Sequence, residues 1–276
     1  MNQRSRIDSL VCWAVLGLAL FFALIPLLWG FSTALKQPSA AESFPPQWLP
    51  HPVTFDNFIS VLFGSNMTRY LLNSLIVGVF SIAVTLTVAA HAGYSAARFR
   101  FSGKKQILFL ILSTTMLPVI CILVPVYLLV TYVNLHNSYL ALVLVYSAWQ
   151  VPTATWIMRG FFESIPTELE EAALIDGTTR LGAFYRIILP LSQPGLAAVG
   201  ILVFVYVWND FLIAFTLTIS NDMRLVQSGL YFFVTESGIE WSRLMAAVVL
   251  ALIPPIATFI LLQSRFIQGL TSGTLK

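Results

Sequence analysis

The residues best suited to chemistry in the apolar second half of this 276-residue chain are Asn209 and Asp210. They interrupt an apolar run from Pro194 to Ile219. A carboxylate inside a bilayer costs at least about 2.5 kcal/mol, so it normally faces a cavity or a partner side chain. Two hypotheses follow for Asp210: it lines or gates a polar path, or it is a buried latch to another helix.

Other residue types that catalyse reactions or bind metals are scattered. The histidines His51, His91 and His136 lie in different loops or at the ends of apolar runs, and Cys12 and Cys121 are far apart in sequence. The sequence contains no HExxH or GxSxG motif and no GxxxxGK[ST] phosphate loop. It therefore predicts no catalytic site, metal site, disulfide framework or ATP site on this chain, which is not expected to be an enzyme.

The composition is that of an integral membrane protein. Hydrophobic residues make up 58% of the chain and charged residues 10%, with a mean hydropathy of +0.83, whereas soluble domains carry about 25% charged residues. Runs of roughly 20 apolar residues are long enough to span a bilayer. They cover about 10–31, 70–90, 107–130, 140–158, 194–219 and 244–262. We expect an all-α membrane protein whose residues 1–276 form one transmembrane domain of six helices.

Two features refine this layout. Prolines inside the predicted spans, at 118, 125, 152, 254 and 255, are expected to bend the helices. If the N-terminus is cytoplasmic, the only basic residues outside are Lys36, Arg69, Arg224 and Arg243, out of 15. The positive-inside rule favours this orientation, with both termini and the basic cluster at 98–105 in the cytoplasm. The segregation of charge gives no reason to expect nucleic-acid binding.

Residues 162–190, here called the elbow, form the only long polar island in the apolar second half. Thr167 and Glu170 have the spacing of a capping box, so a helix is predicted to begin at Glu168. Gly177 is predicted to end it in the left-handed conformation. The orientation above places the elbow in the cytoplasm.

A second helix is predicted to follow at once. Thr178 or Thr179 can cap its start. One apolar face is then expected from residues spaced i, i+3, i+4 and i+7, namely Leu181, Phe184, Tyr185 and Ile188. The elbow is thus predicted to be a helix-turn-helix between two membrane segments.

The elbow resembles the EAA loop of the membrane subunits of ABC importers. The matching positions are Glu171, Ala172, Ala173, Gly177, Ile187, Leu189 and Pro190, with Asp176 beside the glycine. The likeness extends along most of the chain and is greatest to the carbohydrate-importer permeases of the maltose type, in particular the shorter permease of the pair. It implies a type I ABC importer permease bundle with a cytoplasmic coupling helix.

The same resemblance implies partners. A dimer of ABC ATPase subunits would carry ATP and Mg, a second and different permease would complete the path, and an extracytoplasmic sugar-binding protein would deliver substrate at a bacterial or archaeal inner membrane. Ala172 and Ala173 would allow close approach to the ATPase, and Glu171 would offer a carboxylate to a basic partner. The alternative is an ordinary solvated helix with acidic residues in its first turn.

Four shorter segments also resemble parts of these permeases. Trp208, Asn209, Asp210 and Phe211 are similar to a segment that would line the sugar path. The tail residues Gly269, Leu270, Thr271 and Gly273 are similar to a tail that docks between ATPase subunits, the alternative being a mobile terminus. The segment Thr54–Phe58 resembles a motif in the first external loop of these permeases, the alternative being a plain surface loop. The segment 220–243, which contains Glu236, is in the place of a loop that reaches the binding protein, the alternative being a plain loop.

The predicted function is therefore a permease subunit of an ATP-driven importer for a sugar, a polyol or a glycerol phosphate ester. The rival hypothesis is a secondary transporter driven by an ion gradient. Such transporters usually contain internal repeats with broken helices that coordinate ions, and no repeat is visible here. A structural scaffold is a third possibility, but it would leave both the elbow and Asp210 unexplained.

Overall fold

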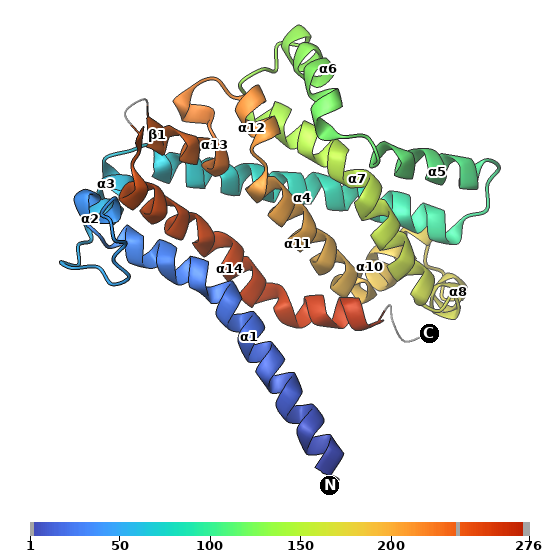
Figure 1. Cartoon of the computed structure of the whole chain (residues 1–276). Helices are drawn as coiled ribbons and strands as arrows, with labels where there is room; N and C mark the ends of the chain where they lie inside the picture. The colour runs from blue at the N-terminus through green and yellow to red at the C-terminus, as the bar shows by residue number, and fades with distance from the viewer. Residues whose placement is uncertain (1–2, 236–237, 273–276) are drawn as a thin grey trace. The chain divides into compact units, whose positions relative to one another are not determined.

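The computed structural model describes residues 3–235 and 238–272, and most of their regular structure is helical (Figure 1). The contacts divide the chain into two compact units. One comprises residues 1–68 and 230–253, and the other 69–229 and 254–276. Two long helices, α4 and α14, run from one unit into the other.

The first unit contains the amino-terminal helix and a short β-hairpin. Its elements are α1 (Gln3–Ala34), α2 (Pro38–Ala41), α3 (Asp56–Phe63), the short 3-10 helix η3 (Tyr231–Phe233), β1 (Val234–Thr235), β2 (Gly238–Ile239) and the start of α14 (Trp241–Ser272). The two strands are antiparallel. In the most apolar 18-residue stretch of α1, no residue is buried within the structure, as expected for a helix whose apolar surface faces lipid or another subunit.

Asn57 holds the loop that follows α1. Its Nδ2 donates hydrogen bonds of 2.8 Å to the carbonyl oxygens of Ala34 and Lys36. The Lys36 side chain is buried with its Nζ 4.1 Å from the centroid of the Trp29 ring, and burial lowers the pKa of this amine. These bonds give the Thr54–Phe58 motif a structural role in the loop.

The second unit holds the elbow and the remaining helices. Its elements are α4 (Met67–Arg98), α5 (Lys104–Thr114), α6 (Val119–Tyr132), α7 (Tyr139–Ser164), α8 (Glu168–Ile175), α9 (Arg180–Ala183), the π-helix η1 (Phe184–Ile188), α10 (Leu189–Leu191), α11 (Gln193–Asn209), α12 (Leu212–Leu217), η2 (Asn221–Met223) and α13 (Val226–Leu230). Among the described residues of the whole chain, four helices are long and apolar enough to cross a membrane, or up to six if each of two bent pairs is one span. These pairs are α5 with α6, and residues 180–191 with α11, which meet at an angle of 73°.

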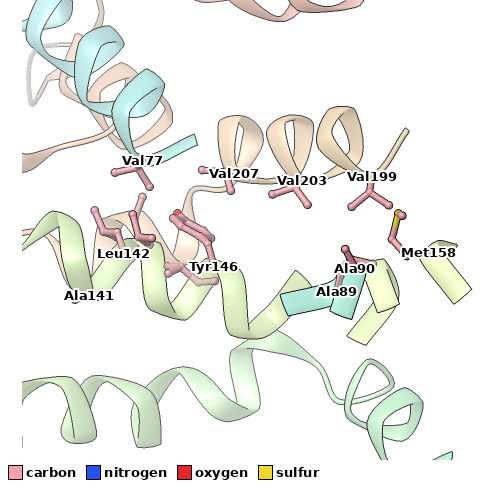
Figure 2. Packing of buried hydrophobic residues seen from close by; sticks show 14 of the residues in the cluster. Val77, Ala89, Ala90, Ala141, Leu142, Tyr146, Met158, Val199, Val203 and Val207 are labelled. Atoms are coloured by element: carbon pink, nitrogen blue, oxygen red, sulfur yellow. The ribbon is translucent and has the colours of Figure 1, made fainter. Parts of the chain in front are cut away.

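The core of this unit lies between α4, α7 and α11. Figure 2 shows Val199, Val203 and Val207, one helical turn apart on α11, facing residues of α7 and α4. Gly93 of α4 lies where that helix crosses α7. A Cβ there would be 2.9 Å from the backbone nitrogen of Arg159. The two backbones therefore approach directly, which fixes the end of α4 that carries Tyr94 and Arg98.

Two predicted spans are not single straight helices. The region 107–130 is divided into α5 and α6, bent by 94° at a break that ends at Pro118. The region 194–219 is divided into α11 and α12 at Asp210 and Phe211, where neither proline nor glycine is present. The prolines 125, 152, 254 and 255 lie inside continuous helices instead.

Candidate functional site

The first elbow helix, α8, begins at Glu168 and ends before Gly177, as predicted. Gly177 has φ +84°, a left-handed conformation that glycine adopts without a Cβ clash. Its N–H donates to the carbonyl of Leu174 (3.1 Å), and the N–H of Thr178 donates to that of Ala173 (3.0 Å). This pair of bonds is the Schellman arrangement, which satisfies the last carbonyls of the helix and fixes the turn.

The predicted capping box is wrong. The Thr167 side chain accepts no capping hydrogen bond. The Glu170 carboxylate is turned into the protein, where Oε1 accepts a 2.5 Å hydrogen bond from Tyr94 Oη and Oε2 one of 3.1 Å from Arg98 Nε. Arg98 also donates through Nη2 to the carbonyl of Ile165 at 2.8 Å. We call Tyr94, Arg98 and Glu170 the Glu170 cluster.

The Glu170 cluster is sheltered from solvent. The Arg98 and Glu170 side chains are only 9% and 11% exposed. A buried carboxylate needs a paired charge and hydrogen bonds, and the two α4 residues supply both. The cluster therefore ties the first elbow helix to the end of a long apolar helix.

The second elbow helix differs from the prediction. Thr179 caps it, since its Oγ1 accepts a 3.1 Å bond from the N–H of Gly182, but α9 is short and continues as the π-helix η1. The wider π turn shifts the side-chain positions. Phe184 and Ile188 are buried, whereas Leu181 and Tyr185 are exposed, so the predicted four-residue face is wrong.

Aromatic contacts also join this part of the elbow to α4. The Phe184 ring lies 4.6 Å from that of Tyr94, measured between centroids. Tyr185 Oη lies 2.7 Å from Nε2 of His91, whose Nδ1 is 2.6 Å from the Thr87 carbonyl. Because the carbonyl can only accept, Nδ1 is the nitrogen that carries a proton in the neutral ring, and Nε2 of that tautomer accepts from the tyrosine hydroxyl.

The predicted coupling residues divide between two faces. Glu171 and Ala172 are exposed on α8, as are Asp176 and Gly177 after it. Ile175 lies on the same face and is 87% exposed. Ala173 is buried against its own chain, so only Ala172 is available for close approach by another protein.

Three predicted residues lie at the base of the elbow instead of its outer face. Ile187 and Leu189 are partly buried and pack against the core. Pro190, near the start of the short helix α10, is exposed. The matched positions therefore form two groups. One is an outer surface on α8, and the other is the end of the elbow that continues into α11, here called the elbow root, with Ile187, Leu189 and Pro190.

Asp210 has the contacts of a latch. Its Oδ2 accepts hydrogen bonds from Tyr146 Oη of α7 (2.9 Å) and from the backbone N–H groups of Ile213 (2.9 Å) and Ala214 (3.2 Å). The carboxylate therefore caps the start of α12 and joins it to α7. This local capping explains why the chain breaks at this position.

The neighbours of Asp210 differ in accessibility. Trp208 is buried and stacks on Phe204, with centroids 5.3 Å apart. Asn209 and Phe211 are exposed, and Asn209 Nδ2 donates to the carbonyl of Val205 at 2.8 Å. We call Trp208, Asn209, Asp210 and Phe211 the Asp210 group. This group and the elbow root lie at opposite ends of α11, about 25 Å apart at 1.5 Å per residue.

Some predicted residues cannot be placed. Gly269, Leu270 and Thr271 belong to α14, but their side chains, like all of Gly273 and Glu236, lie outside the described residues. Within residues 3–235 and 238–272, no group of three or more histidine, cysteine or acidic residues could hold a metal ion. Tyr94 was not predicted as a functional residue, and Arg98 was predicted only as part of the basic cluster, although their i, i+4 spacing puts both on one face of α4.

The fold and the elbow define a multi-span membrane subunit with a polar helix fixed to a long apolar one. Residues 89–272 match the family model described as "Binding-protein-dependent transport system inner membrane component". The chain belongs to this family of ABC transporter permeases.

Relatives and solved structures agree with this assignment. The chain is 34% identical over 253 residues to the sulfoquinovosyl glycerol transport system permease protein of Agrobacterium fabrum, covering 92% of this chain and 89% of that one. It is 34% identical over 267 residues to the trehalose transport system permease protein of Mycobacterium tuberculosis, covering 96% and 97%. A bacterial ABC transporter involved in alginate import superposes with a TM-score of 0.83 at 22% identity, covering 96% and 99%. The fold is that of a type I importer permease.

Proposed function

We propose that this chain is a permease subunit of an ATP-driven importer for a carbohydrate, and that α8 couples it to a cytoplasmic ATPase. The relatives named for sulfoquinovosyl glycerol and trehalose support the carbohydrate class. The observation that carries the coupling role is the Glu170 cluster, which joins α8 to α4 through buried bonds. A secondary transporter would not require such a fixed cytoplasmic helix.

The two faces of α8 have separate tasks in this proposal. The exposed face, with Glu171, Ala172 and Ile175, meets the ATPase. An apolar side chain as exposed as Ile175 in a polar segment suits a partner pocket. When the ATPase moves α8, the buried face passes this movement to α4 through Glu170. Phe184 and Ile188 pass the same movement to the core.

The Asp210 group lies at the other end of α11, and we assign it a positioning role. Asp210 holds the start of α12 against α7, so the exposed Asn209 and Phe211 are the residues placed to meet a sugar. An aromatic ring stacks on the C–H face of a pyranose, and an amide bonds its hydroxyls. Trp208, being buried, supports this segment from behind.

The chain supplies half of the translocation path. A second, different permease, a dimer of ATPase subunits carrying ATP and Mg, and an extracytoplasmic sugar-binding protein complete the assembly. Residues Gly269–Thr271 and Gly273 contact the ATPase pair, and both termini are cytoplasmic.

Site-specific crosslinking tests the coupling role. A photoreactive amino acid at Ile175 should crosslink the ATPase in native membranes. The matched control is Leu110 on α5, which is also exposed and apolar but lies on another helix. Equal crosslinking from both positions, or none from Ile175 in a complex that contains the ATPase, would contradict the proposal.

Transport energetics test the importer class separately. Uptake should require ATP and persist when an uncoupler abolishes the ion gradient. Uptake that stops with the uncoupler while ATP is held constant would favour the secondary transporter instead.

A further inference from the structure

A groove of about 450 Å³ is lined by residues of α5 and α7. Three cations line it, namely Lys104 and Lys105 at the start of α5 and Arg159 of α7. Apolar side chains line the rest, including Leu108, Leu112 and Trp156. The groove therefore has a positive end and an apolar wall.

The order of these residues along α5 matches the shape of an amphiphile. The lysines occupy the first turn, and Leu108 and Leu112 follow at i+4 and i+8 on the same face. From Lys104 to Leu112 the helix rises about 12 Å. The surface of α5 beyond the groove is also apolar, since Leu110 is 64% exposed, as suits a helix in contact with lipid.

The cations are only partly used by the protein. Lys104 Nζ donates to the carbonyl of Phe99 at 3.2 Å, which orients the amine, and Lys105 is exposed. Arg159 pairs through Nε with Glu163 at 2.8 Å, with its Cζ 5.1 Å from the centroid of the Trp156 ring. A guanidinium has five N–H donors, and this pair engages one of them.

We propose that this groove binds an anionic phospholipid, with the phosphate at Lys104, Lys105 and Arg159 and an acyl chain along Leu108 and Leu112. The charge favours an anionic headgroup over a zwitterionic one, and the apolar wall favours a lipid over free phosphate. The predicted cytoplasmic position of the basic cluster puts the headgroup in the inner leaflet. This site is separate from the proposed coupling and sugar-binding residues.

The test uses the full chain in its purified transporter complex, titrated with phosphatidylglycerol and followed by native mass spectrometry. Lys105→Gln removes one exposed positive charge and should weaken binding about fivefold. Lys105→Arg should restore it. The matched control is Arg186→Gln, which removes an exposed basic residue from the elbow and should leave lipid binding unchanged.

Four results would overturn the proposal. The first is that Lys105→Gln binds phosphatidylglycerol as tightly as the natural chain, and the second is that phosphatidylcholine binds the natural chain equally well. The third is that Arg186→Gln weakens binding as much as Lys105→Gln. The fourth is that millimolar inorganic phosphate displaces the lipid, which would assign the cations to free phosphate.

Discussion

Replacing Glu170 by alanine is the sharpest test of how the elbow is held. The substitution removes the acceptor of the Tyr94 hydroxyl and the counter-charge of Arg98 at once. Because the arginine side chain is only 9% exposed, its charge would remain buried without its carboxylate. We expect α8 to detach from α4 while the remaining helices stay folded.

The magnitude follows from this burial. Removing one partner of a buried ion pair costs about 3–5 kcal/mol, and the lost tyrosine acceptor adds to that cost. A matched control is Glu163→Ala, which breaks the Arg159–Glu163 pair. Those side chains are 24% and 45% exposed, and an exposed i, i+4 pair contributes only about 0.3–0.5 kcal/mol.

Hydrogen exchange of the elbow amides in the purified complex measures the difference. A loss of about 3 kcal/mol corresponds to roughly a hundredfold faster exchange between Ala172 and Thr178, because 1.4 kcal/mol is a factor of ten. Glu163→Ala should change the rate less than threefold. If Glu170→Ala exchanged no faster than this control, the packing of Phe184 and Ile188 would hold the elbow, and our account of the Glu170 cluster would be refuted.

Three further substitutions test other parts of the structure. Gly177→Val should uncouple ATP hydrolysis from uptake, because a β-branched residue is strained by more than about 1–2 kcal/mol at φ +84°, whereas Gly177→Asn should keep coupling; unchanged uptake per ATP in the valine variant would contradict this. Asp210→Ala should lower the melting temperature of the complex, since it removes the acceptor of three hydrogen bonds. If the Asp210→Asn complex assembled and its ATPase were stimulated normally, but no substrate were taken up, Asp210 would have a direct role in the translocation path instead. Gly93→Ala should destabilise the complex by about 1–3 kcal/mol through overpacking; Gly160→Ala, on α7 with nothing within 4 Å of its Cβ, should be neutral or stabilising, and equal melting temperatures for the two would refute the close crossing.

Local signals in the elbow were predictable, and long-range ones were not. Gly177 and Thr179 act within a few residues, so their caps follow from sequence alone. The prediction of a capping box was wrong because the Glu170 carboxylate bonds instead to Tyr94 and Arg98, which lie 76 and 72 positions earlier in the sequence. The π-helix was not predicted either. It includes Phe184, whose ring packs against that of Tyr94 on α4, a distant contact that the spacing of apolar residues does not reveal.

The membrane helices show the same division. Hydropathy locates the apolar runs, but residues that are apolar on every side give no sign of which face meets the core. The break of the fifth predicted span was missed because no proline or glycine marks it. Asp210 was interpreted for its charge, while its capping of α12 through two backbone N–H groups decides the local geometry.

Glu170 and Glu171 explain how one short helix can be anchored to its own chain and still present an acidic outer face. Successive residues on an α-helix point about 100° apart, so adjacent carboxylates cannot share one surface. Glu170 points to Arg98, a residue that the sequence analysis interpreted only as a signal of membrane orientation, and Glu171 is left on the exposed side. The basic end of α4 therefore has a second role as the inner anchor of the elbow. The proposed coupling needs Glu170 turned inward and Glu171 turned outward, and the helix provides both only while it is held in this rotation. Disruption of the Glu170 cluster and disruption of the Gly177 turn should therefore impair coupling in the same way.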